Sequence, residues 1–161
     1  MGFASFCVPF LGFLVASFFI QGLEAVSCPL NWFLYEQHCY GFFENKLTWN
    51  DAEIECSSHG KHAHLASIHT EREMETISSV ILTGYKELFK IWIGMFKVPG
   101  KKGKIRMKWV DESVADYIPW APSEPSKNDW RCVQLHDSDY KYWSLQFCEK
   151  KQPYLCKMEV Y

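Results

Sequence analysis

The number and position of the cysteines constrain this chain more than any other feature. Seven are present, and the first of them, Cys7, lies in an apolar N-terminal run. The other six are Cys28, Cys39, Cys56, Cys132, Cys148 and Cys156. An even number of cysteines behind such a run indicates disulfides formed in an oxidising compartment, although spacing alone leaves the pairing open. Zinc is the alternative use of cysteines, but the C-x2-C pairs typical of zinc sites are absent.

The apolar N-terminal run, residues 3–20, contains neither an acid nor a base and is followed by small residues that suit cleavage. We therefore expect residues 1–25 to be a secretory signal peptide and residues 26–161 to form one domain. An uncleaved membrane anchor is the alternative, because the run is nearly long enough to cross a bilayer. The run starts almost at the first residue, contains a proline and lacks a basic flank, and these features favour cleavage and secretion.

Hydrophobic spacing and capping residues predict two helices in the first half of the chain. The first runs from Thr48, a plausible N-cap, toward Gly60, and the second from Thr70, with Glu73 completing a capping box, to Gly84. Strands are expected in a hairpin over 28–43 and in the segments 91–96, 105–110, 131–136, 140–145 and 153–160. Because the helices precede most of the strands, an α+β fold with segregated helices is favoured over repeated βαβ units.

The charge balance and the motifs exclude two classes of function. The formal net charge is -2, whereas wholesale nucleic-acid binding needs a strongly basic domain. The motifs G-x-S-x-G and H-E-x-x-H are absent, and each cysteine after residue 25 has a possible disulfide partner. We therefore expect no enzyme and no nucleic-acid partner.

One stretch, residues 97–108, is strongly basic in an otherwise near-neutral chain. It contains six bases and no acid: Lys97, Lys101, Lys102, Lys104, Arg106 and Lys108. Such a local positive field suits sulfated glycans, anionic lipid or an acidic protein. The alternative is a solvated hairpin tip, where lysines also block pairing between sheet edges.

Histidines and aromatic residues supply further candidates. His59, His62, His64 and His69 lie close together in the sequence, which allows zinc binding or pH sensing, with a structural loop as the alternative. The tryptophans at 49, 92, 109 and 120 are expected in the core. Three aromatic residues nearer the C-terminus are candidates for stacking on sugar rings, with core packing as the default: Trp130, Tyr140 and Tyr142.

Taken in order, these segments resemble the C-type lectin-like domain. The matching pieces run from Cys28 to Lys157 and include "TWNDAEIEC", "HLASIHTEREME", "IWIG", "IPWAPSEPS", "CVQL" and "YLCK". The most similar groups are small secreted forms, namely snake venom lectins and regenerating or eggshell-matrix proteins. The resemblance implies two helices on antiparallel sheets, a long loop region and three disulfides, Cys28–Cys39, Cys56–Cys156 and Cys132–Cys148.

The resemblance also implies a calcium and sugar site, from which this sequence departs. Sugar-binding members hold calcium with an E-P-N or Q-P-D loop, a later acid and a W-N-D strand. Here the loop reads Glu124-Pro125-Ser126, Trp130 takes the place of the acid, and the strand reads Trp143-Ser144-Leu145. Asn128 or Asp129 could move into the vacant acid position. The candidate ligand residues are therefore Glu124, Ser126, Asn128, Asp129 and Ser144, with Glu124 and Asp129 as the candidate calcium ligands.

The sequence thus predicts a secreted lectin-type protein, monomeric or a non-covalent dimer, whose partner is a glycan or glycoprotein. By its Glu-Pro loop the sugar would be of mannose type, and calcium dependence would be weak or lost. One alternative is a calcium-independent module that binds a protein receptor, such as a venom toxin acting on haemostasis or a regenerating-type factor. The other is anionic-ligand binding through residues 97–108.

Overall fold

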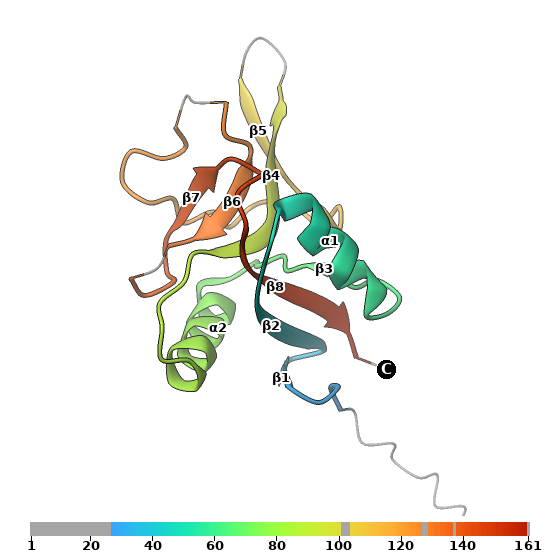
Figure 1. Cartoon of the computed structure of the whole chain (residues 1–161). Helices are drawn as coiled ribbons and strands as arrows, with labels where there is room; N and C mark the ends of the chain where they lie inside the picture. The colour runs from blue at the N-terminus through green and yellow to red at the C-terminus, as the bar shows by residue number, and fades with distance from the viewer. Residues whose placement is uncertain (1–26, 101–103, 127–128, 137, 161) are drawn as a thin grey trace, which may run out of the picture.

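The computed structural model describes residues 27–100, 104–126, 129–136 and 138–160 (Figure 1). In chain order its elements are β1 Trp32–Tyr35, β2 His38–Leu47, α1 Trp49–Ser58, β3 His64–Leu65, α2 Glu71–Gly84, β4 Ile91–Pro99, β5 Ile105–Trp109, β6 Cys132–Leu135, β7 Trp143–Gln146 and β8 Gln152–Glu159. The α+β class is confirmed. Within these residues, no helix combines the length and apolar character that crossing a membrane requires.

Both helices begin where their capping residues predict. The Thr48 side chain accepts a hydrogen bond from the backbone N–H of Asp51 at 3.2 Å, and the Thr70 side chain accepts one from that of Glu73 at 3.1 Å. Each bond satisfies an N–H group that the first helical turn leaves without an intrahelical partner. The end of α1 differs slightly from the prediction, because His59 caps it through a bond to the Cys56 carbonyl before Gly60 is reached.

The strands form one sheet in the order β1-β2-β8-β4-β6-β7, with β3 paired to β8 and β5 paired to β4. Neighbouring strands are antiparallel except β4 and β8, which run parallel where Trp92 faces Tyr154. The expectation of purely antiparallel pairing is corrected at this point. Much of the chain separates β4 from β8, so no tight turn forces them to run in opposite directions.

The helices cover opposite faces of β8 (Figure 1). On one face, α1 packs in a cluster with Tyr154 and Cys156; on the other, α2 packs in a cluster with Leu155. Successive side chains of a strand point to opposite faces, so one central strand serves both cores. Trp49, Trp92 and Trp109 are buried as predicted, and Trp120 is half-buried against the α2 cluster.

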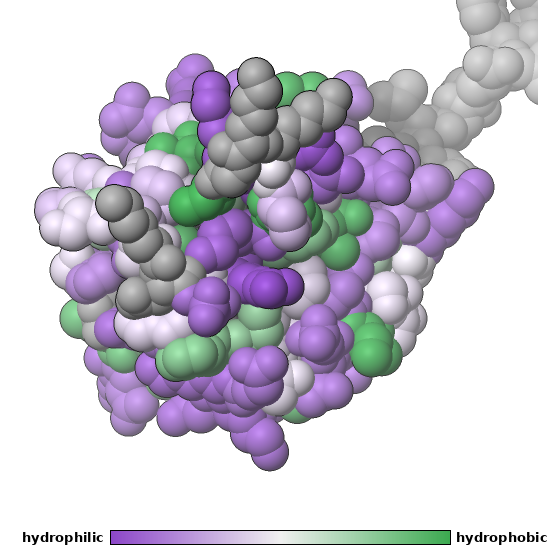
Figure 2. All heavy atoms as spheres, turned by 90° about the horizontal axis from the view of Figure 1, so that it is seen from above, coloured by the Kyte–Doolittle hydropathy of each residue, from purple (hydrophilic) through white to green (hydrophobic). Residues whose placement is uncertain are grey.

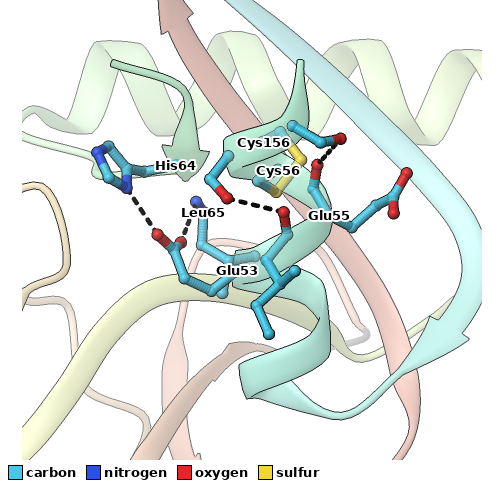
Figure 3. The surroundings of a disulfide bond; sticks show 9 residues. Glu53, Glu55, Cys56, His64, Leu65 and Cys156 are labelled. Atoms are coloured by element: carbon cyan, nitrogen blue, oxygen red, sulfur yellow. Dashed lines mark hydrogen bonds and ion pairs between the residues drawn. A yellow bond between two sulfur atoms is a disulfide. The ribbon is translucent and has the colours of Figure 1, made fainter. Parts of the chain in front are cut away.

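All three implied disulfides are confirmed. Cys28–Cys39 ties the start of the domain to β2, and Cys132–Cys148 ties β6 to the segment after β7. Cys56–Cys156 joins α1 to β8 across a sequence separation of 100 residues (Figure 3). In the chain-entropy model a loop of that length stabilises the fold by about 4–5 kcal/mol.

Candidate functional site

The segment before Glu124 is fixed to the edge of the sheet by backbone hydrogen bonds. The N–H of Trp143 donates to the Pro119 carbonyl at 2.9 Å, and the N–H of Ala121 donates to the Trp143 carbonyl at 2.8 Å. These bonds lay the segment alongside β7 (Figure 1). The loop that resembles the sugar-binding loop is therefore held next to the strand that resembles W-N-D.

Within the loop, the side chain of Glu124 is partly committed to its own backbone. Its Oε2 accepts from the N–H of Ser126 at 2.7 Å across the cis Glu124–Pro125 peptide. The hydroxyl of Ser126 is buried and has no hydrogen-bond partner among the described residues. A buried hydroxyl without a partner is unusual, so a polar group from outside the described chain would suit it.

Gln134 is a polar residue of this region that the sequence interpretation left without a role. It lies on β6 directly opposite Ser144 on β7, and its Nε2 donates to the Ser144 hydroxyl at 3.0 Å. Its Oε1 is buried without a partner among the described residues. The only signal in the sequence is an amide between apolar residues in "CVQL", and the facing residue depends on the register. We call Glu124, Ser126, Gln134 and Ser144 the loop site.

The donor set of the loop site does not suit calcium. Calcium prefers six to eight oxygen ligands that include several carboxylates, and Glu124 is the one carboxylate here. Leu145 is only 1% exposed and belongs to the core. No three His, Cys, Asp or Glu side chains of the described residues come together as they would around an ion. Asn128 lies outside the described residues.

Asp129, the other candidate calcium ligand, lies among basic residues. It lines a hollow of about 220 Å³ beside the turn end of the β4–β5 hairpin together with Lys97, Lys104 and Arg131. These bases compete with a calcium ion for its carboxylate.

The predicted basic stretch divides between the two faces of the β4–β5 hairpin. Lys108 faces Phe96 and Arg106 faces Val98, whereas Lys97 faces Met107. Because facing residues of antiparallel strands point to the same side, Arg106 and Lys108 share one face with Lys104, and Lys97 belongs to the other. We call Lys104, Arg106 and Lys108 the basic face. Lys101 and Lys102 lie outside the described residues; Figure 2 looks onto this end of the molecule, whose surface is largely hydrophilic.

The three aromatic candidates for sugar stacking differ in how far they are buried. Tyr140 is fully buried and its hydroxyl accepts from the N–H of Phe89 at 3.0 Å, so it is a core residue, as the default interpretation had it, and is not available for stacking. Tyr142 is 48% exposed. Trp130 is half-buried and packs edge-on against Phe147, with 5.4 Å between ring centroids.

The histidines of the "HLASI" region lie in two different places. His59 stacks on Phe43 at 5.0 Å, and the other three line a common hollow with His38, a residue that the sequence interpretation left without a role. His38 comes from β2, so only the strand register brings it near the other three.

Comparisons with known proteins place the chain in one family. The model of the lectin C-type domain matches residues 45–158. Regenerating islet-derived protein 4 of Rattus norvegicus is 38% identical over 132 residues, covering 81% of either chain. C-type lectin BiL of Bothrops insularis is 33% identical over 149 residues, covering 91% of this chain and 92% of its own.

A similarity of structure supports the same assignment. Human lithostathine superposes with a TM-score of 0.74 at 31% identity, covering 82% of this chain and 99% of its own. The region that the family model matches contains both helices, the strands from β3 to β7, nearly all of β8 and two of the three disulfides in full. The chain therefore belongs to the C-type lectin domain family.

Proposed function

We propose that this protein is a secreted carbohydrate-binding protein that uses the loop site, with calcium contributing weakly or not at all. Membership of the lectin family supports sugar as the ligand class. The observation that carries the proposal is the hydrogen bond between Gln134 and Ser144, on the strand pair to which the Glu124 loop is attached. We also propose that residues 1–25 are its signal peptide and that the protein has no catalytic activity.

The loop site offers sugar hydroxyls direct hydrogen bonds in place of an ion. A carboxylate accepts several hydrogen bonds, and no described residue donates to Oε1 of Glu124. The Ser144 hydroxyl adds a donor and an acceptor, and the exposed ring of Tyr142 offers an apolar surface nearby on the chain. Neutral bonds of this kind contribute modestly, so we expect weak binding of one sugar and stronger retention on a multivalent glycan. The Glu124-Pro125 pair favours a mannose-type sugar.

Retention on immobilised mannan tests the proposal. The protein should be retained in EDTA and in calcium alike, and Glu124→Gln should weaken retention because the amide replaces one acceptor oxygen with a donor. The matched control is Glu149→Gln, which makes the same change at an exposed turn. Retention that requires calcium, or that Glu124→Gln leaves unchanged, would contradict the proposal.

The basic face supports a second candidate function, the binding of sulfated glycans. Lys104, Arg106 and Lys108 are exposed and alternate along one face of β5 and its approach. Replacing all three by alanine should lower the salt concentration at which the protein elutes from heparin, since exposed charges act through a screened field. The control removes three exposed lysines elsewhere, Lys86, Lys150 and Lys151. If the two triple variants eluted at the same salt concentration, net charge alone would explain heparin binding and the basic face would not be the site.

A further inference from the structure

A second hollow, of about 310 Å³, lies apart from the loop site. None of its lining residues belongs to the 119–126 segment, to β6 or to β7. Four of its lining residues are histidines, namely His38, His62, His64 and His69. We call this hollow the histidine pocket. Its volume is at the lower end of the range of about 300–1,000 Å³ that small-molecule sites occupy.

The register of β8 with its neighbours explains why these side chains meet. His38 faces Glu159 and Tyr40 faces Lys157 across β2 and β8, and His64 faces Lys157 across β3 and β8. Facing residues point to the same side of a sheet, and so do residues two apart on one strand. One side of these three strands therefore carries two imidazoles, an ammonium and a carboxylate.

The floor of the pocket is a fixed ion pair. Lys157 is 8% exposed and its ammonium donates to Glu73 at 3.1 Å, to the Ser67 carbonyl at 3.0 Å and to the Ser67 hydroxyl at 3.3 Å. Glu73 also accepts from the Tyr40 hydroxyl and from the N–H of His69. Burial, reinforced by the Glu73 charge, raises the pKa of Tyr40, so the phenol keeps its proton. Since these groups satisfy one another, the floor is pre-organised and carries no net charge.

The imidazoles of the walls keep nitrogens available. His64 bonds through Nδ1 to Glu53 at 2.6 Å, which leaves Nε2 on the other side of the ring (Figure 3). His69 uses Nε2 in a contact of 3.2 Å with Ser67. No described residue forms a hydrogen bond with the ring of His38 or His62. A protonated ring donates through both nitrogens, so these walls could supply donors to a ligand.

The fixed charges around the imidazoles give the pocket a net negative charge near neutral pH. Lys157, Glu159 and Asp111 line it. Two more carboxylates contact lining residues, namely Glu73 on α2, which is bonded to Lys157, and Glu53 on α1, which is bonded to His64. Burial raises the pKa of Asp111, but hydrogen bonds from Ser113 and Ser67 outweigh it and hold this pKa below its usual value. The carboxylates therefore outnumber the one ammonium until the imidazoles take up protons.

Protonation of the imidazoles would reverse this balance. Imidazoles are the side chains that ordinarily gain a proton between about pH 8 and pH 5. Burial, with the Lys157 charge, lowers the pKa of His38 despite the opposing charges of Glu73 and Glu159, so this ring is neutral near pH 7. Four protonated rings would add four positive charges to the walls.

We propose that the histidine pocket binds the carboxylate or sulfate of an acidic sugar unit in mild acid and releases it near neutral pH. The protonated walls supply charge-assisted donors, which form shorter and stronger bonds to anions than neutral groups do. The site is separate from the loop site, so it stands whether or not the loop site binds mannose.

Calorimetric titration with glucuronic acid tests the proposal, with glucose as a neutral sugar of the same ring size. Glucuronate should bind at least about tenfold more tightly near pH 5.5 than near pH 7.5, because each added proton favours the anion. Glucose should not bind at either pH, and inorganic sulfate should compete with glucuronate. Equal affinity at both pH values, binding of glucose alone, or failure of sulfate to compete would overturn the proposal.

Variants assign the effect to the pocket. His38→Gln and His62→Gln should each reduce the pH dependence, whereas His59→Gln, outside the pocket, should not. A second measurement does not depend on variants that fold: the ring proton signals of the histidines are followed by NMR against pH. Glucuronate should raise the pH at which pocket histidines gain a proton, by linkage, and leave His59 unchanged. A shift of His59 alone, or of none, would exclude the pocket.

Discussion

Single substitutions decide what the loop can bind. Ser126 has a hydroxyl where the E-P-N or Q-P-D loop has an amide or a carboxylate, and Ser144 has one where the W-N-D strand has an amide. Leu145 fills the core where that strand has a carboxylate. The sequence was enough to identify these departures, because each stands at a motif position. For Gln134 the sequence shows only an amide among apolar residues, and for His38 it shows no signal, since the neighbours of both residues come from other strands and are set by register.

The buried pair of Glu73 and Lys157 gives a prediction at this scale. Glu73→Gln should destabilise the fold by about 3–5 kcal/mol, because it leaves the Lys157 ammonium buried without a counter-charge. Lys157→Met should cost a similar amount, and the double variant should cost less than the sum of the two. Urea unfolding of all four proteins measures the coupling. Additive losses would mean that the two charges do not stabilise each other.

The lowered pKa of His38 predicts how stability depends on pH. The folded chain holds this proton less well than the unfolded chain, so the unfolded state binds more protons as the pH falls. The contribution of neutral His38 to the free energy of unfolding is therefore complete above the pKa of histidine in the unfolded chain, about 6.5, and is lost as the pH falls below it. Urea midpoints from about pH 7.5 to pH 5 should fall less steeply in His38→Gln than in the native protein. His59→Gln, with the native slope expected, is the control.

At the scale of elements, local signals predicted the helices and missed part of the sheet. Thr48 and Thr70 cap helices through bonds within three residues, and such signals are visible in the sequence. The parallel contact of β4 with β8 joins Trp92 to Tyr154, and the division of the basic stretch between two faces follows from the register of β4 with β5. Neither pairing leaves a local trace, because both depend on how distant segments pack.

The close approach of β3 to β4 depends on one glycine. A Cβ atom on Gly94 would lie 2.3 Å from the carbonyl oxygen of Leu65, a backbone atom that cannot rotate away. Gly94→Ala should therefore destabilise the protein by about 1–3 kcal/mol or more, as overpacking of a core does. Gly84→Ala is the control, since nothing lies within 4 Å of its added methyl. Thermal unfolding that ranks the two variants equally would mean that the two strands can separate at little cost.

At the scale of the molecule, the polar sites occupy regions that the core holds apart. The loop site depends on β6 and β7, and the histidine pocket on β2, β3 and β8, with α1 and α2 packed on opposite faces of β8. The hydrophobic patterning predicts the core but not which polar residues converge on its surface. Because the two sites share no residue, changes at one should leave the other intact.

Two of the disulfides should contribute unequally to the stability of the domain. Removing Cys56–Cys156 by paired alanines frees a loop of 100 residues, whereas removing Cys28–Cys39 frees one of 11. The chain-entropy model gives losses of about 4–5 kcal/mol for the first and about 3 kcal/mol for the second. The first bridge also lies in the core between α1 and β8, so its alanines leave a cavity that adds to the loss. Urea unfolding under non-reducing conditions should therefore place the midpoint of the Cys56/Cys156 variant clearly below that of the Cys28/Cys39 variant. The reverse order would show that the N-terminal hairpin, and not the link between α1 and β8, limits the stability of the domain.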